Sequence, residues 1–425
     1  MFPRLLSFSL VACTLCVVPA VAQDHPDVTT PVSGPTAAPE HPGTASSATE
    51  IDVNDIWRIV RRHEMTRKAD VKSSERYLVL APSIGSKPTT GLSGGFSGNV
   101  AFVRGDSDTT HISTLSGGLK VSQKGQVLFG SRLALFTAND KWFILGDNRM
   151  AWTSQSTYAL GADAPLTSGT NARLDVLKLY ESAYRAVGPG LFVGGGVNVS
   201  SHFNVQPGTT TSTEAWNDSA YLAYNEAHGF SSAHQNSSGV NVGFRYDTRD
   251  NGINADSGSL ASATYRAFMA GFLGGDSTWQ ELAFDVRTYR KITPDARQRL
   301  AFWFLGDLVT GGTAPFWDLP ATATDGRSAR GYAEGRYRGE RLLYWETEYR
   351  ATLTNNGLLG MVAFANLTTI DSVETGERLF RSFAPGAGFG LRVLLNKRSR
   401  TNLCADWGWG KQGSHGFYLS IQEAF

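Results

Sequence analysis

Residues 281–289 read Glu-Leu-Ala-Phe-Asp-Val-Arg-Thr-Tyr, and the alternation in this segment is the clearest indication of the fold class. Bulky or β-branched side chains fall on one side of an extended chain and charged side chains on the other: Leu282, Phe284, Val286 and Thr288 against Glu281, Asp285 and Arg287. A period of two places alternate side chains on opposite faces of a β-strand. The same rhythm returns in residues 127–135 and 341–353. The pattern therefore predicts strands that have one apolar and one polar face.

The same two-residue alternation predicts about sixteen strands in residues 77–425. They are expected near residues 77–84, 91–104, 111–122, 125–138, 141–153, 173–186, 189–204, 238–249, 256–269, 278–292, 296–310, 340–354, 357–370, 382–396, 400–411 and 416–425. The connections alternate between tight turns and the long segments 154–172, 205–237 and 311–338. An even number of strands with short periplasmic turns and long external loops is typical of bacterial outer-membrane barrels.

The fold class predicted is all-β, a transmembrane antiparallel β-barrel of about sixteen strands. A large soluble β-sandwich or propeller would also show alternation. Several of the predicted strands reach about 12–15 residues, however, which exceeds the usual length in soluble proteins. No repeat of the kind that marks propeller blades is visible. The barrel is therefore the preferred interpretation, and its apolar exterior would face outer-membrane lipid.

The amino-terminal part of the chain has the features of an exported protein. Residues 1–22 resemble a signal peptide, with Arg4 before an apolar stretch and a small-x-small cleavage site at Ala20-Val21-Ala22. Leu10-Val11-Ala12-Cys13 also fits a lipoprotein box, so lipidation at Cys13 is an open alternative. Residues 23–50, rich in Pro, Thr and Ser, predict a disordered linker. Residues 51–76 predict a short periplasmic segment that is partly helical.

Charge and motifs exclude several classes of function. Removal of residues 1–22 takes away one basic and no acidic residue, which leaves 38 of each, so a nucleic-acid partner is not expected. Cys404 is then the only cysteine, and the eight histidines lack His-x-x-x-His spacing, so no metal site or cofactor is predicted. Gly91-Leu92-Ser93-Gly94-Gly95 matches a nucleophile elbow, but it lies in a predicted strand with no helix after it. No catalytic residue is predicted, and the chain is not expected to be an enzyme.

The last predicted strand carries a candidate assembly signal. Phe417, Leu419, Ile421 and Phe425 are expected on one face, with Tyr418, Ser420 and Gln422 opposite. A terminal Phe on an alternating strand resembles the signal of outer-membrane proteins that the barrel-assembly machinery recognises during biogenesis. Glu423 departs from the apolar residue usual at that position.

The segment 311–339, between the eleventh and twelfth predicted strands, contains Ala329-Arg330-Gly331-Tyr332. This resembles the (Val/Ile)-Arg-Gly-(Phe/Tyr) motif of the barrel superfamily that includes BamA, TamA and two-partner secretion transporters. The resemblance implies that the sixth external loop folds into the lumen and that Arg330 pairs with Glu348. In the family's Phe-x-Asp-x-Gly pattern, this chain has Asn366 in place of the acid, so a neutral hydrogen bond is expected there.

An alternative for the same motif is a solvated loop whose arginine contacts only water. An unpaired buried charge would cost several kcal/mol, so an arginine inside a lumen needs a partner, and a carboxylate can form a charge-assisted bond with it. Glu346, Arg350 and Arg287 are interpreted as ordinary lumen-lining charges.

A second motif supports the resemblance. Tyr246-Asp247-Thr248-Arg249-Asp250-Asn251, followed by Gly258, resembles the family's Asp-x-Arg-Asp-Asn periplasmic turn, although Ala255 replaces the usual Pro. Residues 82–91 resemble the first hairpin of the barrel, and residues 386–406 resemble its last strands. The resemblance covers essentially all of residues 77–425.

The resemblance implies a role in outer-membrane protein assembly or translocation. The family's periplasmic POTRA modules are not expected here, because no complete module fits between Gln23 and Glu75. Partners would be unfolded protein cargo or a separate periplasmic protein. The sequence leaves two alternatives open: a passive pore for small solutes, since about sixteen strands can enclose an aqueous lumen, and a structural surface antigen.

Overall fold

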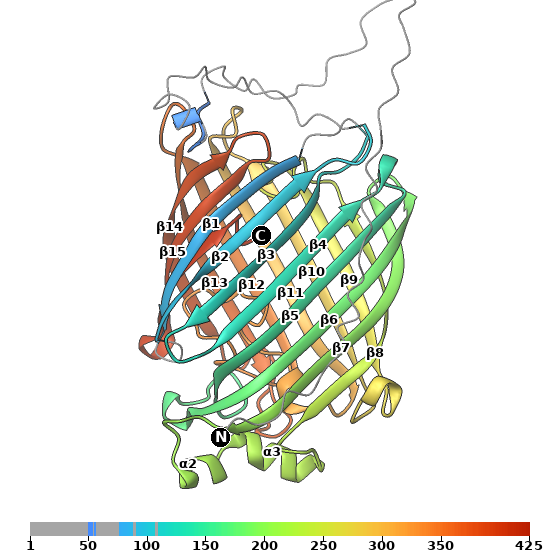
Figure 1. Cartoon of the computed structure of the whole chain (residues 1–425), viewed down its shortest axis with the longest axis vertical. Helices are drawn as coiled ribbons and strands as arrows, with labels where there is room; N and C mark the ends of the chain where they lie inside the picture. Colours follow the sequence, from blue (N-terminus) through green and yellow to red (C-terminus); the bar gives the residue numbers. More distant parts are fainter. Residues whose placement is uncertain (1–49, 54, 57–75, 88–90, 107–108) are drawn as a thin grey trace, which may run out of the picture. The chain divides into compact units, whose positions relative to one another are not determined.

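The computed structural model describes residues 50–53, 55–56, 76–87, 91–106 and 109–425 (Figure 1). The predicted signal peptide and almost all of the predicted linker lie outside the described residues. Most of the segment predicted to be partly helical, residues 51–76, lies outside them too.

Sixteen strands form one sheet, and each pairs antiparallel with the next in sequence order. Their bounds are β1 Arg76–Lys87, β2 Gly91–Phe102, β3 Ser113–Ser122, β4 Val127–Phe136, β5 Trp142–Thr157, β6 Thr170–Gly188, β7 Leu191–Pro207, β8 Gln235–Asp247, β9 Gly258–Phe268, β10 Trp279–Lys291, β11 Gln298–Gly312, β12 Arg341–Thr352, β13 Leu359–Asp371, β14 Ala384–Asn396, β15 Thr401–Gly410 and β16 His415–Ile421. The prediction of an antiparallel all-β barrel is confirmed. Among the described residues there is no helix that is both long enough and apolar enough to cross a membrane.

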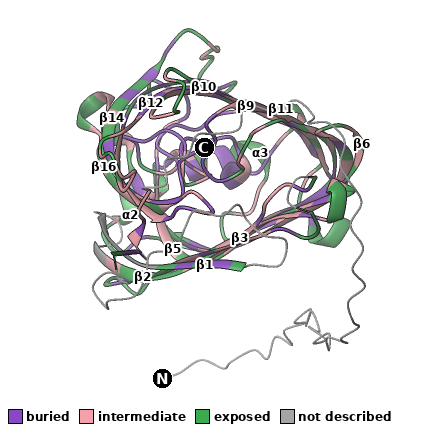
Figure 2. Ribbon diagram, turned by 90° about the horizontal axis from the view of Figure 1, so that it is seen from above, coloured by how far each residue is buried: buried purple, intermediate pink, exposed green. Residues whose placement is uncertain are grey.

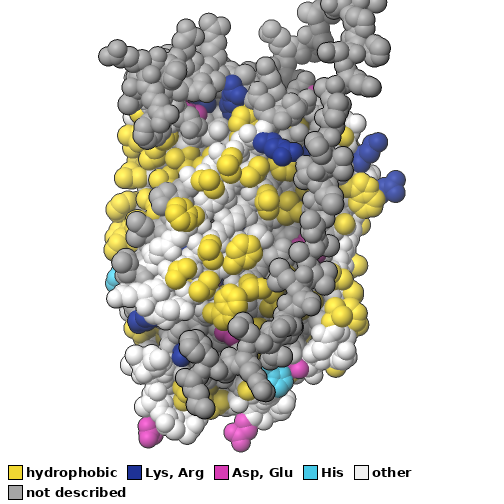
Figure 3. Space-filling model, viewed as in Figure 1, with side chains coloured by type: hydrophobic (Ala, Val, Ile, Leu, Met, Phe, Trp, Pro, Cys, Tyr) yellow, Lys and Arg dark blue, Asp and Glu magenta, His cyan; other side chains and the backbone are white. Residues whose placement is uncertain are grey.

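Each strand has one face toward the lumen and one toward the exterior. On β12, Trp345 is 56% exposed on the outer wall, whereas its neighbour Glu346 is fully buried. Hydrophobic side chains cover the wall seen in Figure 3, and the ring of strands in Figure 2 surrounds buried loops. The two-residue period thus divides an apolar exterior from a polar, filled interior.

The short helices lie in the connections between strands. They are η1 Ala138–Asp140, η2 Leu166–Ser168, α2 Thr213–Asn217, α3 Ala220–His228, η3 Phe272–Gly274, η4 Phe316–Asp318 and η5 Lys411–Gly413. The helices α2 and α3 were missed in the segment 205–237, which was expected only as a long loop. The hydroxyls of Ser212 and Ser219 accept hydrogen bonds from the first turns of α2 and α3. The sequence signal was therefore present, as a serine at the N-cap of each helix.

The helix α3 packs on the external loop between β11 and β12. The Tyr221 and Tyr224 rings lie 5.3 and 5.7 Å from the Phe316 ring of η4, and the Tyr224 hydroxyl donates to the Ala314 carbonyl at 2.8 Å. This aromatic cluster lies at the end of the barrel where α2 and α3 are drawn in Figure 1. Its burial stabilises the position of the loop that carries the candidate site.

At the opposite end, residues 50–53 and 55–56 dock on the turn between β14 and β15. Asp52 and Asp55 accept hydrogen bonds from each other's backbone N–H, an arrangement that starts a helix. The Lys397 ammonium lies 2.7 Å from the Asp55 carboxylate, and the Lys397 N–H donates to Asp52 at 3.0 Å. All three residues are buried, so the contact is a desolvated ion pair on the turn.

The strands β1 and β16 are the two ends of the sheet order, and they lie next to each other. Over the described residues, no backbone ladder joins them. The strand β1 has 12 residues, so the expectation of a short first strand (77–84) was wrong, whereas β16 has only seven. We call this β1–β16 boundary the seam.

The strand β16 ends earlier than predicted because the backbone turns at Gln422, where φ is +78°. The expectation that Phe425 shares the outward face with Phe417 was therefore wrong. Phe417 is 51% exposed, whereas Phe425 is 4% exposed and packs 5.1 Å from the ring of Trp303, on the lumen face of β11. We call residues 422–425 the inward hook. The carboxyl end of the chain lies inside the ring of strands in Figure 2.

Candidate functional site in the barrel lumen

Loop six, defined here as residues 313–340, leaves β11, folds into the lumen and returns to β12. Arg330 near its middle is 2% exposed. Its guanidinium lies 2.5 Å from Glu346 Oε1 and 2.6 Å from Asp406 Oδ2, and it also bonds to the Glu348 carboxylate. The Phe364 ring lies 3.7 Å from the guanidinium carbon. We call Arg330, Glu346, Glu348 and Asp406 the arginine cluster.

The electrostatics of the arginine cluster favour a charged Arg330. Burial by itself would lower the pKa of Arg330, but Glu346, Glu348 and Asp406 raise that pKa well above its ordinary value. Because several carboxylates surround one guanidinium, loss of the arginine would leave acidic groups unpaired in a desolvated site. Such losses are more costly than loss of a surface ion pair.

The structure brings Arg330 and Glu348 together, as the motif implied. Asn366 lies beside them, and its amide N–H donates to the Arg330 backbone carbonyl at 3.1 Å, so this neutral hydrogen bond is made to the backbone of Arg330 and not to its guanidinium. The interpretation of Glu346 as an ordinary lumen-lining charge was wrong, because it is a direct partner of Arg330. A usable signal existed: Glu346 and Glu348 are two residues apart and therefore share a face of β12. Asp406 was part of the expected resemblance to the last strands, but its pairing with Arg330 was not predicted, because Asp406 lies on a strand distant in sequence.

The two residues after Arg330 fit a narrow space against β15. The φ of Gly331 is +113°, and a Cβ there would lie 2.7 Å from the Trp409 backbone. The Gly331 N–H donates to the Tyr418 hydroxyl at 2.9 Å. The Tyr332 hydroxyl accepts from the Lys411 N–H at 2.9 Å and donates to the Pro385 carbonyl. Glycine is required here by both backbone conformation and close approach.

Two further arginines connect the arginine cluster to the inward hook. Arg350 bonds to Glu348 at 2.6 Å and donates to the Phe425 carbonyl at 2.9 Å. Arg392 bonds to Asp406 and, at 2.7 Å, to Glu423. Burial alone would raise the pKa of Glu423, but Arg392 and Arg350 lower it to about 2. Glu423 stands where an apolar residue is usual, and its carboxylate thus lies near the two cations Arg392 and Arg350.

The tip of loop six reaches the opposite wall of the barrel. Arg132 of β4 donates to the Asp325 carbonyl at 2.5 Å, and Arg149 of β5 donates to the Thr324 carbonyl at 2.8 Å. Arg149 also pairs with Glu334 at 3.1 Å. Loop six is therefore held from β4 and β5 on one side and from β12 and β15 on the other, and it spans the lumen.

The predicted turn motif organises the connection between β8 and β9. The Asp247 carboxylate bonds to the Arg249 guanidinium at 2.8 Å, and Asn251 Oδ1 accepts from the N–H groups of Ile253 and Asn254. Asp250 caps the turn through two N–H groups and pairs at 2.7 Å with Arg400, in the turn between β14 and β15. Gly258 has a φ of +95°. The motif thus links two turns that are distant in sequence.

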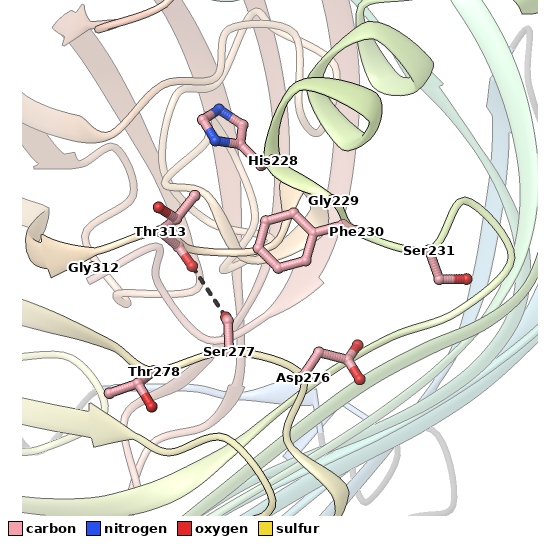
Figure 4. Close-up of a pocket in the computed structure, with 9 residues that line it drawn as sticks. All are labelled: His228, Gly229, Phe230, Ser231, Asp276, Ser277, Thr278, Gly312 and Thr313. Carbon is pink, nitrogen blue, oxygen red and sulfur yellow. Dashed lines mark hydrogen bonds between the residues drawn. The ribbon is translucent and has the colours of Figure 1, made fainter.

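A separate pocket of about 470 Å³ opens beside α3 (Figure 4). Phe230 and His228 line it together with the polar segments 276–278 and 312–313. His228 is paired at 2.8 Å with Glu374 of the connection between β13 and β14, and Ser277 donates to the Thr313 carbonyl at 3.0 Å. These contacts join four external loops in two pairs, β7–β8 with β13–β14 and β9–β10 with β11–β12.

The Omp85 superfamily domain matches residues 149–425, which is more than half of the chain. A comparison with curated protein sequences found no match.

Two solved structures are similar in fold. BamA from Haemophilus ducreyi lacking POTRA domains 1–3 superposes with a TM-score of 0.50 at 13% identity, over 82% of this chain and 69% of that chain. CdiB from Acinetobacter baumannii superposes with a TM-score of 0.51 at 12% identity, over 82% of this chain and 59% of that chain. The resemblance expected from the motifs is confirmed, and the chain belongs to the Omp85 superfamily of outer-membrane barrels.

Proposed function

We propose that this protein assists the insertion or translocation of outer-membrane proteins, and that unfolded cargo engages the seam. The observation that carries the proposal is the missing ladder between β1 and β16 over the described residues. An unpaired strand edge presents free N–H and C=O groups and is a template for an added strand. A segment of cargo could therefore pair at the seam in an extended conformation.

The length mismatch at the seam supports the same proposal. The seven residues of β16 span about 24 Å at a rise of roughly 3.4 Å per residue, against about 41 Å for the 12 residues of β1. Beyond Ile421 the inward hook leaves the wall. The periplasmic end of β1 then lies near the β14–β15 turn, where the Arg398 guanidinium lies 5.9 Å from the Tyr77 ring. On its seam edge, this part of β1 thus lies beside a side chain and not beside a paired strand.

The filled lumen argues against a passive pore as the main role. Loop six spans the interior, and the aromatic cluster on α3 covers it toward one end. An open diffusion path through the barrel would require loop six to leave the arginine cluster. We therefore favour a function at the wall of the barrel over transport through its centre.

The test is a reversible cross-link of the seam. One cysteine replaces Leu80 of β1, and a second replaces Phe417, Leu419 or Ile421 of β16 in turn, in a Cys404→Ala background. The protein is reconstituted in vesicles, and insertion of an unfolded barrel substrate is measured together with ionic conductance. We expect the oxidised seam to block insertion and a reductant to restore it.

The matched control is a cross-link within an existing ladder. Leu119 of β3 and Phe129 of β4 are Cα partners on the outer wall, so cysteines at these positions should leave insertion unchanged. Insertion that survives a locked seam would contradict the proposal. Persistent conductance under those conditions would favour the pore, and the absence of both activities would favour a structural role.

A further inference from the structure

A second cavity, of about 420 Å³, lies in the lumen between the tip of loop six and the inner faces of the strands from β3 to β12. Its lining contains seven basic but only four acidic residues, which are Asp147, Asp285, Asp307 and Asp325. The lining itself is therefore basic, although Asp247 and Glu281 beside it pair with three of its arginines.

Most of the basic groups in this lining have a carboxylate partner. Arg287 pairs with Asp285, Arg266 with Glu281, and both Arg245 and Arg249 with Asp247. Arg132 and Lys178 share Asp147 at the longer distances of 3.6 and 3.8 Å. Among the described residues, Arg327 is the one basic group of this lining whose guanidinium has no ion pair or hydrogen bond.

The carboxylate nearest to Arg327 in sequence, Asp325, takes part in the local fold of loop six. Asp325 is two residues away, but its Oδ1 accepts from the N–H groups of Arg327 and Ser328 and from the Ser328 hydroxyl, each at 2.8 Å. This carboxylate stabilises the turn that presents Arg327 to the cavity. Asp307 of β11 also lines the cavity, but it forms no ion pair with Arg327 among the described residues.

Cations from two facing strands line the cavity together with Arg327. Burial lowers the pKa of Arg327 and the charges of Arg132 and Arg287 lower it further, while Asp325 and Asp147 partly offset this effect, so that the pKa is about 9. Arg132 and Arg287 come from β4 and β10, on the inner wall, and Arg327 comes from the loop. Three guanidinium groups on separate elements therefore line one cavity, and a bound anion would relieve their repulsion.

We propose that this lumen cavity binds a small free oxyanion, of the phosphate or carboxylate class, with Arg327 as its principal contact. A guanidinium presents paired N–H donors that match the oxygens of either class. The site is separate from the arginine cluster, and it does not depend on the proposed action at the seam. The cavity lies on the lumen side of the barrel wall, so the ligand that we propose is a soluble anion and not a lipid headgroup.

The test measures binding of inorganic phosphate to the purified barrel by calorimetry, in a nonionic detergent and at constant ionic strength set with chloride. We expect saturable binding, with about one phosphate per chain, and on the order of ten- to hundredfold weaker binding in Arg327→Gln, the range expected for loss of charged hydrogen bonds. Arg327→Lys keeps the charge and should bind more tightly than Arg327→Gln. Acetate in place of phosphate separates the carboxylate class from the phosphate class, and binding of either supports the site.

The control is Arg290→Gln, an exposed arginine at the end of β10, which should bind phosphate as the wild type does. Heat-modifiable gel mobility verifies that each variant is folded. No saturable binding of either anion to the wild type would overturn the proposal, and so would equal affinity in Arg327→Gln. Stabilisation by phosphatidylglycerol vesicles that requires Arg327 in the absence of free anion would also overturn it, because it would place the site on a lipid-accessible surface.

Discussion

The guanidinium of Arg330 lies 2.6 Å from the carboxylate of Asp406, although 76 residues separate them in the chain. Arg330 belongs to a loop and Asp406 to β15, the neighbour of the last strand of the seam. Asp406 also bonds to Arg392, which holds Glu423 of the inward hook. The position of loop six and the course of the chain after β16 are thus connected through a few buried ion pairs.

Arg330→Ala should reduce the folded fraction of the barrel strongly. The substitution leaves Glu346, Glu348 and Asp406 without their shared cation, a loss of about 3–5 kcal/mol for a buried ion pair. Heat-modifiable gel mobility after refolding would measure the effect. Arg336→Ala is the comparison, since Arg336 is equally buried but bonds to neutral groups, the Ala164 carbonyl and the Gln412 side chain. Equal losses in the two variants would count against a special role of the arginine cluster.

Glu423→Gln should remove an acid-sensitive part of the stability. The pKa of Glu423 is about 2 in the folded state, against an ordinary value near 4.5. A depressed pKa gives stability that is fully present above pH ~4.5 and is lost as the pH falls toward 2, an effect of about 3 kcal/mol. Denaturant unfolding at several pH values would show a flatter acid limb in Glu423→Gln than in the wild type. An unchanged slope between pH 4.5 and 2 would contradict the pairing of Glu423 with Arg392.

Gly258→Ala should impair folding at the β8–β9 turn. The φ of Gly258 is +95°, and a Cβ would lie 2.2 Å from the Thr248 carbonyl oxygen, so the backbone must move. The cost should be about 1–3 kcal/mol, measured as a lower denaturant midpoint. Gly94→Ala in β2 is the control, because a Cβ there meets no atom within 4 Å. A similar loss in the control would show that the turn geometry is not the cause.

Lys397→Met should release residues 50–53 and 55–56 from the β14–β15 turn. Asp52 and Asp55 are buried against Lys397, and without the cation their charges favour solvent. Hydrogen exchange of the Ile51 N–H, which donates to the Asn356 carbonyl at 2.9 Å, should become at least about tenfold faster, which corresponds to 1.4 kcal/mol. Lys291→Met, at an exposed end of β10, should leave this exchange unchanged. Slow exchange in Lys397→Met would mean that other contacts hold the segment.

The sequence alone determined the barrel and most of its strand boundaries. A strand places alternate side chains on opposite faces, so each strand records locally which face meets lipid and which meets the lumen. All sixteen strands could therefore be located, and so could the loop that carries Arg330. The glycine at 331 was identifiable as part of a motif.

Only the tertiary structure decided which charges meet in the lumen and where the chain turns after β16. Glu346, Asp406 and Arg392 lie on three strands, and the register and curvature of the closed sheet bring them to one point. The inward hook depends on a single backbone turn at Gln422 and on contacts with Trp303 and Arg350, which no local pattern contains. The two-residue alternation is visible in the sequence because it depends only on neighbouring residues, whereas a pairing across the lumen depends on how the whole sheet closes.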